Sequence, residues 1–263
     1  EEGVLLIYTS DDGENWTYLN RLQDKQFGTV LECPDVFCID GQHILIASPI
    51  GVLNGTDYPG NQSTMQKLSF DAEDGSMALE SEAQFLDYGM DLYAPQSCID
   101  EAGRRCVIAW VRMPIPQSPD DNEAADGRPW SGMMSLPRIV TLRDGEIYTS
   151  VHPNVREYFA ENSCEESTEK YIRWTKDGRS RTVLTLREGQ SVELAGVMIE
   201  LNGGCVCTDR TKRVPQGVDV HVKCCTPGVG DVCELEVYEE KNLIEIFVND
   251  GQYVISNVLY PCR

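Results

Sequence analysis

A series of Asp-Gly pairs, each set between two short runs of β-prone residues, constrains what this sequence can fold into. The pairs are Asp40-Gly41, Asp74-Gly75, Asp144-Gly145, Asp177-Gly178 and Asp250-Gly251. A tight turn between antiparallel strands needs positive φ angles, which Gly adopts freely. Another hairpin is predicted from Cys98-Ile99 to 105–110, and no long stretch has helical periodicity. The sequence therefore predicts an all-β protein with one short helix at 154–162.

The predicted strands form two groups, divided near residue 154. Loops before this point are long and rich in Gly and Pro, whereas turns after it are tight. We interpret 1–153 as blades of a β-propeller and 154–263 as a linker and a β-sandwich. The segment Thr9-Ser-Asp-Asp-Gly-Glu-Asn-Trp16 resembles the Asp-box turn of propeller enzymes, in which the Trp packs between blades. A common Asp-Gly turn beside a core Trp explains it equally well.

The charge of the chain restricts its partners. Asp and Glu number 43 against 22 Lys and Arg, which gives a formal net charge of −21. Such a chain repels phosphate backbones and anionic membrane surfaces, so neither nucleic acid nor a membrane is expected as a partner. A neutral ligand fits this charge better than a polyanion does.

Eleven cysteines, an odd number, cannot all pair within one chain. Cys33, Cys38, Cys98 and Cys106 stand in apolar, strand-like contexts, where a reduced Cys behaves as a small core residue. A cluster near the C-terminus matches no standard zinc spacing, so neither a metal nor a cofactor is expected; it comprises Cys205, Cys207, Cys224, Cys225 and Cys233. These features predict a reducing cytoplasm, or secretion if a signal precedes Glu1, because the chain begins without Met.

The segment Glu32-Cys-Pro-Asp35 places a carboxylate at the lip of a predicted strand, before a proline that interrupts a regular ladder. Apolar neighbours could raise the pKa of such a carboxyl group toward working pH, which suits a general acid. Taken alone, the segment is equally compatible with an ordinary strand entry.

Four segments in order resemble glycoside hydrolase family 32, the invertases, fructanases and sucrose-6-phosphate hydrolases. They are Glu32-Cys-Pro-Asp35, Asp87-Tyr-Gly-Met-Asp-Leu-Tyr-Ala-Pro-Gln96, Arg105-Cys-Val-Ile-Ala-Trp110 and Trp130-Ser-Gly-Met-Met-Ser-Leu-Pro-Arg138. The run Leu243-Ile-Glu-Ile-Phe-Val-Asn-Asp-Gly251 is similar to the end of that family's C-terminal sandwich. The resemblance implies a five-bladed propeller with an axial active site, followed by a β-sandwich.

The resemblance also implies roles for four residues. Glu32 would be the general acid/base of a retaining, two-carboxylate mechanism, while Asp91 and Tyr93 would line the pocket near the fructosyl unit. Trp110 would offer an aromatic face to sugar C–H groups. Structural alternatives are a turn cap for Asp91, packing between blades for Tyr93 and a core position for Trp110.

This sequence departs from the family pattern in its other carboxylates. The family's nucleophile lies in an Asn-Asp-Pro-Asn-Gly segment and its transition-state-stabilising Asp in an Arg-Asp-Pro segment, and neither segment occurs here. Acid catalysis alone contributes roughly 10²–10⁴-fold, so the chain as it stands is expected to be inactive or nearly so. The resemblance therefore implies a partial propeller made of the later blades, which a missing N-terminal segment or a partner chain would complete.

Three functions follow as hypotheses. The first is a β-fructofuranosidase-type hydrolase acting on sucrose or short fructans, and the second is a non-catalytic carbohydrate-binding or structural remnant. The third, a sialidase-like enzyme, needs clustered arginines for a substrate carboxylate, and the acidic composition argues against it. A phosphorylated sugar would also need a basic pocket, for which Arg112, Arg128 and Arg138 are available.

Overall fold

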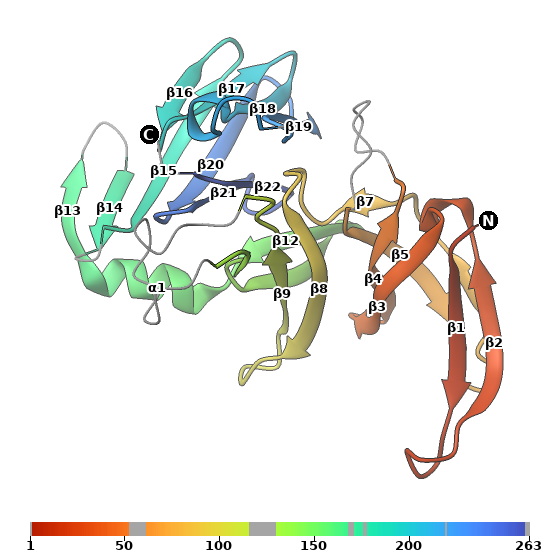
Figure 1. The fold of residues 1–263 in the computed structure, drawn as a ribbon. Coiled ribbons are helices and arrows are strands. Elements are labelled where there is room, and N and C mark those ends of the chain that lie inside the picture. Colours follow the sequence, from red (N-terminus) through yellow and green to blue (C-terminus); the bar gives the residue numbers. More distant parts are fainter. Residues whose placement is uncertain are drawn as a thin grey trace. The chain divides into compact units, whose positions relative to one another are not determined.

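The computed structural model describes residues 2–52, 62–115, 130–167, 171–175, 178–218 and 220–260. Strands dominate these residues, which confirms the all-β prediction (Figure 1). The predicted short helix is present as α1 (Pro153–Asn162), and 3₁₀ turns occur at Lys25–Phe27 and Thr211–Arg213. The chain divides into two compact units, each described by itself. The first comprises Glu1–Leu86 and Tyr93–Ser97, and the second Asp87–Leu92 and Cys98–Arg263.

The first unit contains two antiparallel sheets. One pairs β1 (Val4–Thr9) with β2 (Thr17–Gln23). The other has the order β3-β4-β5-β6, with β7 also paired to β5; its strands are β3 (Val30–Ile39), β4 (Gln42–Ile50), β5 (Thr64–Phe70), β6 (Met77–Leu79) and β7 (Gln84–Phe85). Apolar side chains from both sheets share one core, made of Leu5, Phe27, Leu45, Ala47 and Leu68.

The second unit contains three sheets. In the first, β10 and β11 pair one after the other with β9, β12 pairs with β11, and β8, whose residues Tyr93–Ser97 belong to the first unit, also pairs with β9. The strands are β8 (Leu92–Ile99), β9 (Arg105–Val111), β10 (Met133–Met134), β11 (Arg138–Arg143) and β12 (Glu146–Val151). A six-stranded sheet has the order β13-β14-β15-β20-β21-β22, with strands at Ser163–Ser167, Tyr171–Thr175, Ser180–Arg187, Val232–Glu239, Leu243–Val248 and Tyr253–Val258.

A four-stranded sheet lies against the six-stranded one. Its strands follow in chain order as β16 (Ser191–Leu194), β17 (Val197–Asn202), β18 (Cys205–Asp209) and β19 (Lys223–Gly228). β17 contacts β15 and β19 contacts β22, and Figure 1 shows these strands stacked as two layers.

Strands before and after residue 153 share hydrophobic cores within the second unit. One core joins Val111 and Met113 to later residues; those later residues are Leu243, Val258 and Tyr260. Another packs Val151 and Phe159 against Tyr238, Phe247 and Val254. The predicted division into 1–153 and 154–263 therefore stays a prediction, because burial of apolar surface continues across it.

The predicted Asp-Gly turns connect paired strands. Asp40-Gly41 joins β3 to β4 with φ angles of 50° and 84°, and Asp144-Gly145 joins β11 to β12 with 51° and 81°. Asp74-Gly75 and Asp250-Gly251 lie in the loops of the β5–β6 and β21–β22 hairpins. Asp177 lies outside the described residues, although β14 and β15, on either side of it, are paired.

The expectation that Trp16 is buried is wrong, since the side chain is 61% exposed in the described structure. The turn itself is shaped as the Asp-box resemblance implies. The Asp12 carboxylate accepts hydrogen bonds from the backbone N–H groups of Glu14 and Asn15, and these bonds hold the pKa of Asp12 well below its usual range. The turn is therefore ordered by its own backbone and needs no packing by the Trp.

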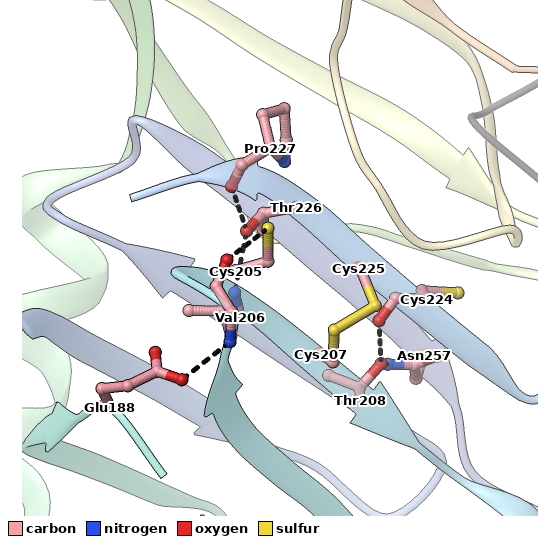
Figure 2. The surroundings of a disulfide bond; sticks show 11 residues. Glu188, Cys205, Val206, Cys207, Thr208, Cys224, Cys225, Thr226, Pro227 and Asn257 are labelled. Atoms are coloured by element: carbon pink, nitrogen blue, oxygen red, sulfur yellow. Dashed lines mark hydrogen bonds between the residues drawn. A yellow bond between two sulfur atoms is a disulfide. The ribbon is translucent and has the colours of Figure 1, made fainter. Parts of the chain in front are cut away.

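The cysteines differ from the prediction in two respects. Cys38 and Cys98 are exposed, so they are not core residues; the alternation of each strand points them to solvent. Cys207 and Cys225 form a disulfide between directly opposed positions of β18 and β19, with a Cα–Cα distance of 4.1 Å (Figure 2). The linear sequence does not reveal which cysteines of a cluster face each other.

Candidate functional site

Glu32 lies at a β-bulge in β3, within the first unit. Glu32 opposes Ser48, but the register with β4 shifts before Asp35 opposes Ile46. Pro34 falls inside this irregularity, as expected for a residue that cannot donate to the ladder. Cys33 has a φ of 50°, a left-handed conformation that non-glycine residues seldom adopt. Glu32 is therefore the last residue of β3 in regular register before the bulge and this left-handed residue interrupt the strand.

Tyr93 is the partner that the structure brings to Glu32. The Tyr93 hydroxyl donates a hydrogen bond of 2.6 Å to Glu32 Oε2, and the Tyr93 ring is buried. Ala94, the next residue, also has a φ of 50°, and its backbone N–H donates to Ser48 Oγ at 3.1 Å. Two of the four predicted site residues, Glu32 and Tyr93, are therefore in contact, and each precedes a non-glycine residue with a left-handed backbone conformation.

The environment of Glu32 differs from the prediction in its polarity. We expected apolar neighbours, but the Glu32 side chain is exposed and its closest polar partner is a hydroxyl group. Strand alternation explains this difference, because the preceding residue, Leu31, packs against the core and Glu32 therefore projects from the opposite face of β3.

Asp91 belongs to the second unit, where it is buried and paired with Arg210. Arg210 donates to both carboxylate oxygens of Asp91, and the backbone N–H of Val258 donates to Oδ2 at 2.9 Å. The Asp91 charge, against the opposing effect of burial, raises the pKa of Arg210. The substrate-binding role of Asp91 stays a prediction, and a sugar hydroxyl would have to share an oxygen that is already engaged.

A second buried network was not foreseen from the sequence. The Arg138 guanidinium donates to Asp87 Oδ2 and to Glu245 Oε1, both at 2.7 Å, and to Ser256 Oγ at 2.8 Å. Burial raises the pKa of Glu245, although the Arg138 charge opposes this shift. The network connects Asp87, the first residue of one family-like segment, to Arg138, the last residue of another. It also includes Glu245 of β21 and Ser256 of β22. The nearest signal in the sequence was the presence of Asp87 and Arg138 within those segments.

Trp110, the predicted aromatic surface, lies on β9 with 43% of its side chain exposed. Gly132 approaches the indole so closely that a Cβ on it would lie 2.3 Å from Trp110 Nε1, and its φ is 86°. Only glycine fits both conditions. Trp110 is therefore not a core residue, and the exposed part of its ring is available for a ligand.

The arginines considered for a phosphorylated sugar are in different situations. Arg138 is fully buried in its ion network, so it cannot reach a ligand. Arg112 donates to the backbone carbonyls of Met90 and Asp91, and Arg128 lies outside the described residues. No basic pocket of these three residues is formed in the part of the chain that is described.

The described ranges contain no group of three or more His, Cys, Asp or Glu side chains that could hold a metal ion. No helix there combines the length and hydrophobicity that crossing a bilayer requires.

The chain is similar to known proteins over the segments that carry this site. A family model described as the glycosyl hydrolases family 32 N-terminal domain matches residues 1–153. The sucrose-6-phosphate hydrolase of Vibrio alginolyticus is 29% identical, over 98% of this chain and 54% of its own length. This chain thus spans about half the length of the curated relatives it matches.

Solved structures have a similar fold. The sucrose-6-phosphate hydrolase from Lactobacillus gasseri superposes with a TM-score of 0.76 at 24% identity, covering 98% of this chain and 56% of that one. A mutant Bombyx mori family 32 β-fructofuranosidase in complex with sucrose gives a TM-score of 0.65 at 22% identity, with coverages of 98% and 56%. Because the family model matches more than half of the sequence, this chain belongs to glycosyl hydrolase family 32.

Proposed function

We propose that this chain is part of a β-fructofuranosidase-type hydrolase that cleaves the fructosyl bond of sucrose or short fructans with retention, using two carboxylates. Family membership and the names of the relatives support the substrate class. The observation that carries the catalytic proposal is the Tyr93–Glu32 hydrogen bond, which joins two of the family-like segments. We further propose that the strands form later blades of a β-propeller followed by a β-sandwich, which the likeness to solved structures supports.

In this proposal Glu32 protonates the glycosidic oxygen and later removes a proton from water. Tyr93 donates to Oε2, which leaves Oε1 to carry the transferred proton. The exposed position of Glu32 allows substrate and water to reach it. A donor held by a buried ring fixes the rotamer of the carboxylate, and general acid catalysis depends on such positioning.

Asp91 and Trp110 are proposed to contact the sugar. Trp110 has the exposed ring that stacking on sugar C–H groups needs. Asp91 would accept a sugar hydroxyl while keeping its pairing with Arg210. The proposal for Asp91 is the weaker in physical terms, because its carboxylate is buried and fully engaged.

The retaining mechanism needs a second carboxylate as nucleophile. The 263 residues contain neither the Asn-Asp-Pro-Asn-Gly nor the Arg-Asp-Pro segment of the family. We therefore infer that this chain does not turn over substrate alone, and that an N-terminal segment or a partner chain supplies the nucleophile. The alternative is a non-catalytic carbohydrate-binding subunit, which the same absence and the exposed Trp110 favour.

The cellular location stays a prediction. A reducing cytoplasm was expected, but the Cys207–Cys225 disulfide weighs against it, since structural disulfides are rare in reduced compartments.

The test is fructose release from sucrose and from sucrose 6-phosphate, measured on this chain and on the protein encoded by its complete reading frame. We expect activity only in the complete protein, and Glu32→Gln should lower its kcat by about 10²–10⁴-fold while sugar binding persists. Glu82→Gln, an exposed glutamate of the same unit, is the matched control and should change little. Wild-type turnover by Glu32→Gln would refute the acid role, and an inactive complete protein that still binds sucrose would favour the alternative.

A further inference from the structure

The turn between β8 and β9 fixes which residues of these two strands face each other. Asp100 N–H donates to the Arg104 carbonyl and Gly103 N–H to the Asp100 carbonyl, both at 2.9 Å. β8 ends at Ile99, β9 begins at Arg105 and the two strands are paired, so a regular ladder continued from this turn opposes Ile99 to Arg105 and, one step further, Cys98 to Cys106. Cys98 also acts electrostatically on the Cys106 thiol, which agrees with this register. Both belong to the second unit.

The two cysteines project from the same face of this hairpin. Side chains two residues apart on a strand share a face, so Cys98 lies with Asp100 and Cys106 with Arg104. The Asp100 and Arg104 side chains meet across the hairpin, with Arg104 Nε 2.7 Å from Asp100 Oδ2. His152 also contacts Asp100 Oδ2, and it lines a cavity of about 430 Å³ together with Cys106. These contacts place Cys106 on the Asp100 face independently of the strand alternation.

The spacing of such a pair is suitable for a disulfide. Directly opposed residues in a hydrogen-bonded antiparallel pair have Cα atoms about 5.5 Å apart. Disulfides span Cα separations of about 4.4–6.8 Å. The same unit already contains a disulfide between directly opposed strand residues, Cys207 and Cys225 (Figure 2).

The other free cysteines with a defined strand register do not face a cysteine. Their opposed residues are His43 for Cys38, Gly228 for Cys205, Thr208 for Cys224 and Leu186 for Cys233. Cys33 lies in the bulge of β3. Among the described free cysteines, the hairpin pair therefore has a geometry that the others lack.

We propose that Cys98 and Cys106 are a redox-active pair that a low-molecular-weight disulfide, such as oxidised glutathione, converts into a second disulfide of this unit. This inference is independent of the proposed glycosidase function.

The exposed residue reacts first. Cys98 is open to solvent, whereas burial raises the pKa of the Cys106 thiol and so lowers its thiolate fraction. The Cys98 thiolate attacks the glutathione disulfide and releases one glutathione thiolate, leaving a mixed disulfide. The Cys106 thiolate then attacks the Cys98 sulfur and releases the second glutathione. In total, two protein thiols lose two protons and two electrons, and one oxidised glutathione becomes two reduced molecules.

Trypsin separates the two cysteines, which makes the bond directly measurable. Cleavage after Lys67, Arg104, Arg105 and Arg112 yields peptides 68–104 and 106–112, each with one cysteine. The chain is reduced, desalted, exposed to about 0.1 mM oxidised glutathione, alkylated and digested for mass spectrometry. An effective concentration on the order of millimolar between the two thiols predicts at least about 10-fold more linked peptide than glutathione adduct on Cys98.

Variants of the pair and of Cys38 complete the test. Cys106→Ser should leave one stable glutathione on Cys98, whereas Cys38→Ser, which removes an exposed cysteine opposite His43, should leave the linked peptide unchanged. Re-formation of the Cys207–Cys225 bond shows that the oxidant is effective. A lasting glutathione adduct on wild-type Cys98 with Cys106 still alkylated would overturn the proposal. So would two unreacted thiols under conditions in which Cys207–Cys225 has re-formed.

Discussion

Acidic side chains have opposite environments in the two units. Glu32 of the first unit is exposed and accepts a hydrogen bond from one tyrosine hydroxyl. Asp87 and Glu245 of the second unit are buried, and Arg138 is bonded to both. A carboxylate that exchanges protons with a substrate must be reachable, whereas one that holds strands together must be shielded and paired. The burial and the partners of each carboxylate therefore decide whether it can exchange protons or holds strands together, and the family-like segment that contains it does not.

Removing Arg138 should have the largest effect on stability. Arg138→Met leaves two buried carboxylates without their cation, and breaking a buried ion pair typically costs about 3–5 kcal/mol. Glu32→Gln should change the free energy of unfolding by no more than about 1 kcal/mol, because the exposed replacement has the same shape and its amide oxygen still accepts the Tyr93 hydroxyl. Urea denaturation of this chain measures both values.

Two further variants control this comparison. Arg210→Met leaves one buried carboxylate, that of Asp91, and should also be strongly destabilising. Lys212→Met removes a cation that is 68% exposed and should have an effect within about 0.5 kcal/mol. If Arg138→Met and Lys212→Met change the free energy of unfolding equally, the buried network does not stabilise the second unit.

Tyr93→Phe should affect activity more than stability. Hydrogen bonds to charged groups contribute about 1.5–3 kcal/mol, so loss of the hydroxyl should lower kcat of the complete protein by roughly 10–100-fold. KM should change little, because the hydroxyl acts on Glu32 and not on the sugar. Tyr18→Phe, an exposed tyrosine of β2, is the control. If Tyr93→Phe raises KM and leaves kcat intact, Tyr93 is a substrate contact, as the family resemblance implies.

Gly132→Ala should displace the Trp110 ring. Backbone strain at a non-glycine residue of positive φ costs about 1–3 kcal/mol, and a new Cβ would also collide with Trp110 Nε1. Gly103→Ala is the matched control, since its φ is 79° but its Cβ would meet no atom within 4 Å. Gly132→Ala should therefore be the more destabilising of the two and should alone change tryptophan fluorescence. If both variants lower the free energy of unfolding equally, the Trp110 indole accommodates the new Cβ without an energetic penalty.

Asp100 should give a small, pH-dependent effect. Hydrogen bonds, the largest contribution coming from the Arg104 backbone N–H, lower the pKa of Asp100 to about 2. A pKa below its unfolded value of about 3.9 stabilises the fold above that pH, and the stabilisation is lost as the pH falls toward 2. The difference in unfolding free energy between wild type and Asp100→Asn should therefore be larger at pH 7 than at pH 3. A difference that does not vary with pH would assign the effect to the lost hydrogen bonds alone.

Part of the site was predictable because local chemistry determined it. Pro34 predicted an interruption of the strand beside Glu32, and the bulge of β3 lies there, whereas the close approach of Gly132 to Trp110 had no such signal. The left-handed conformations of Cys33 and Ala94 gave no such signal, since neither residue favours positive φ. The burial of Trp16 was predicted wrongly, because a turn ordered by Asp12 can leave its aromatic residue in solvent. The Cys207–Cys225 bond was missed because pairing depends on the register between strands.

The sequence by itself determined the class of fold, the positions of the hairpins and the family, because turn residues and strand patterns act over a few neighbours. Only the tertiary structure decided the partners of the charged groups. Asp91 and Arg210 are 119 positions apart, and Asp87 and Ser256 are 169 apart, yet each pair is in contact. Contacts over such separations depend on how strands pair and layers pack, so the same type of carboxylate becomes exposed at Glu32 and buried at Asp91.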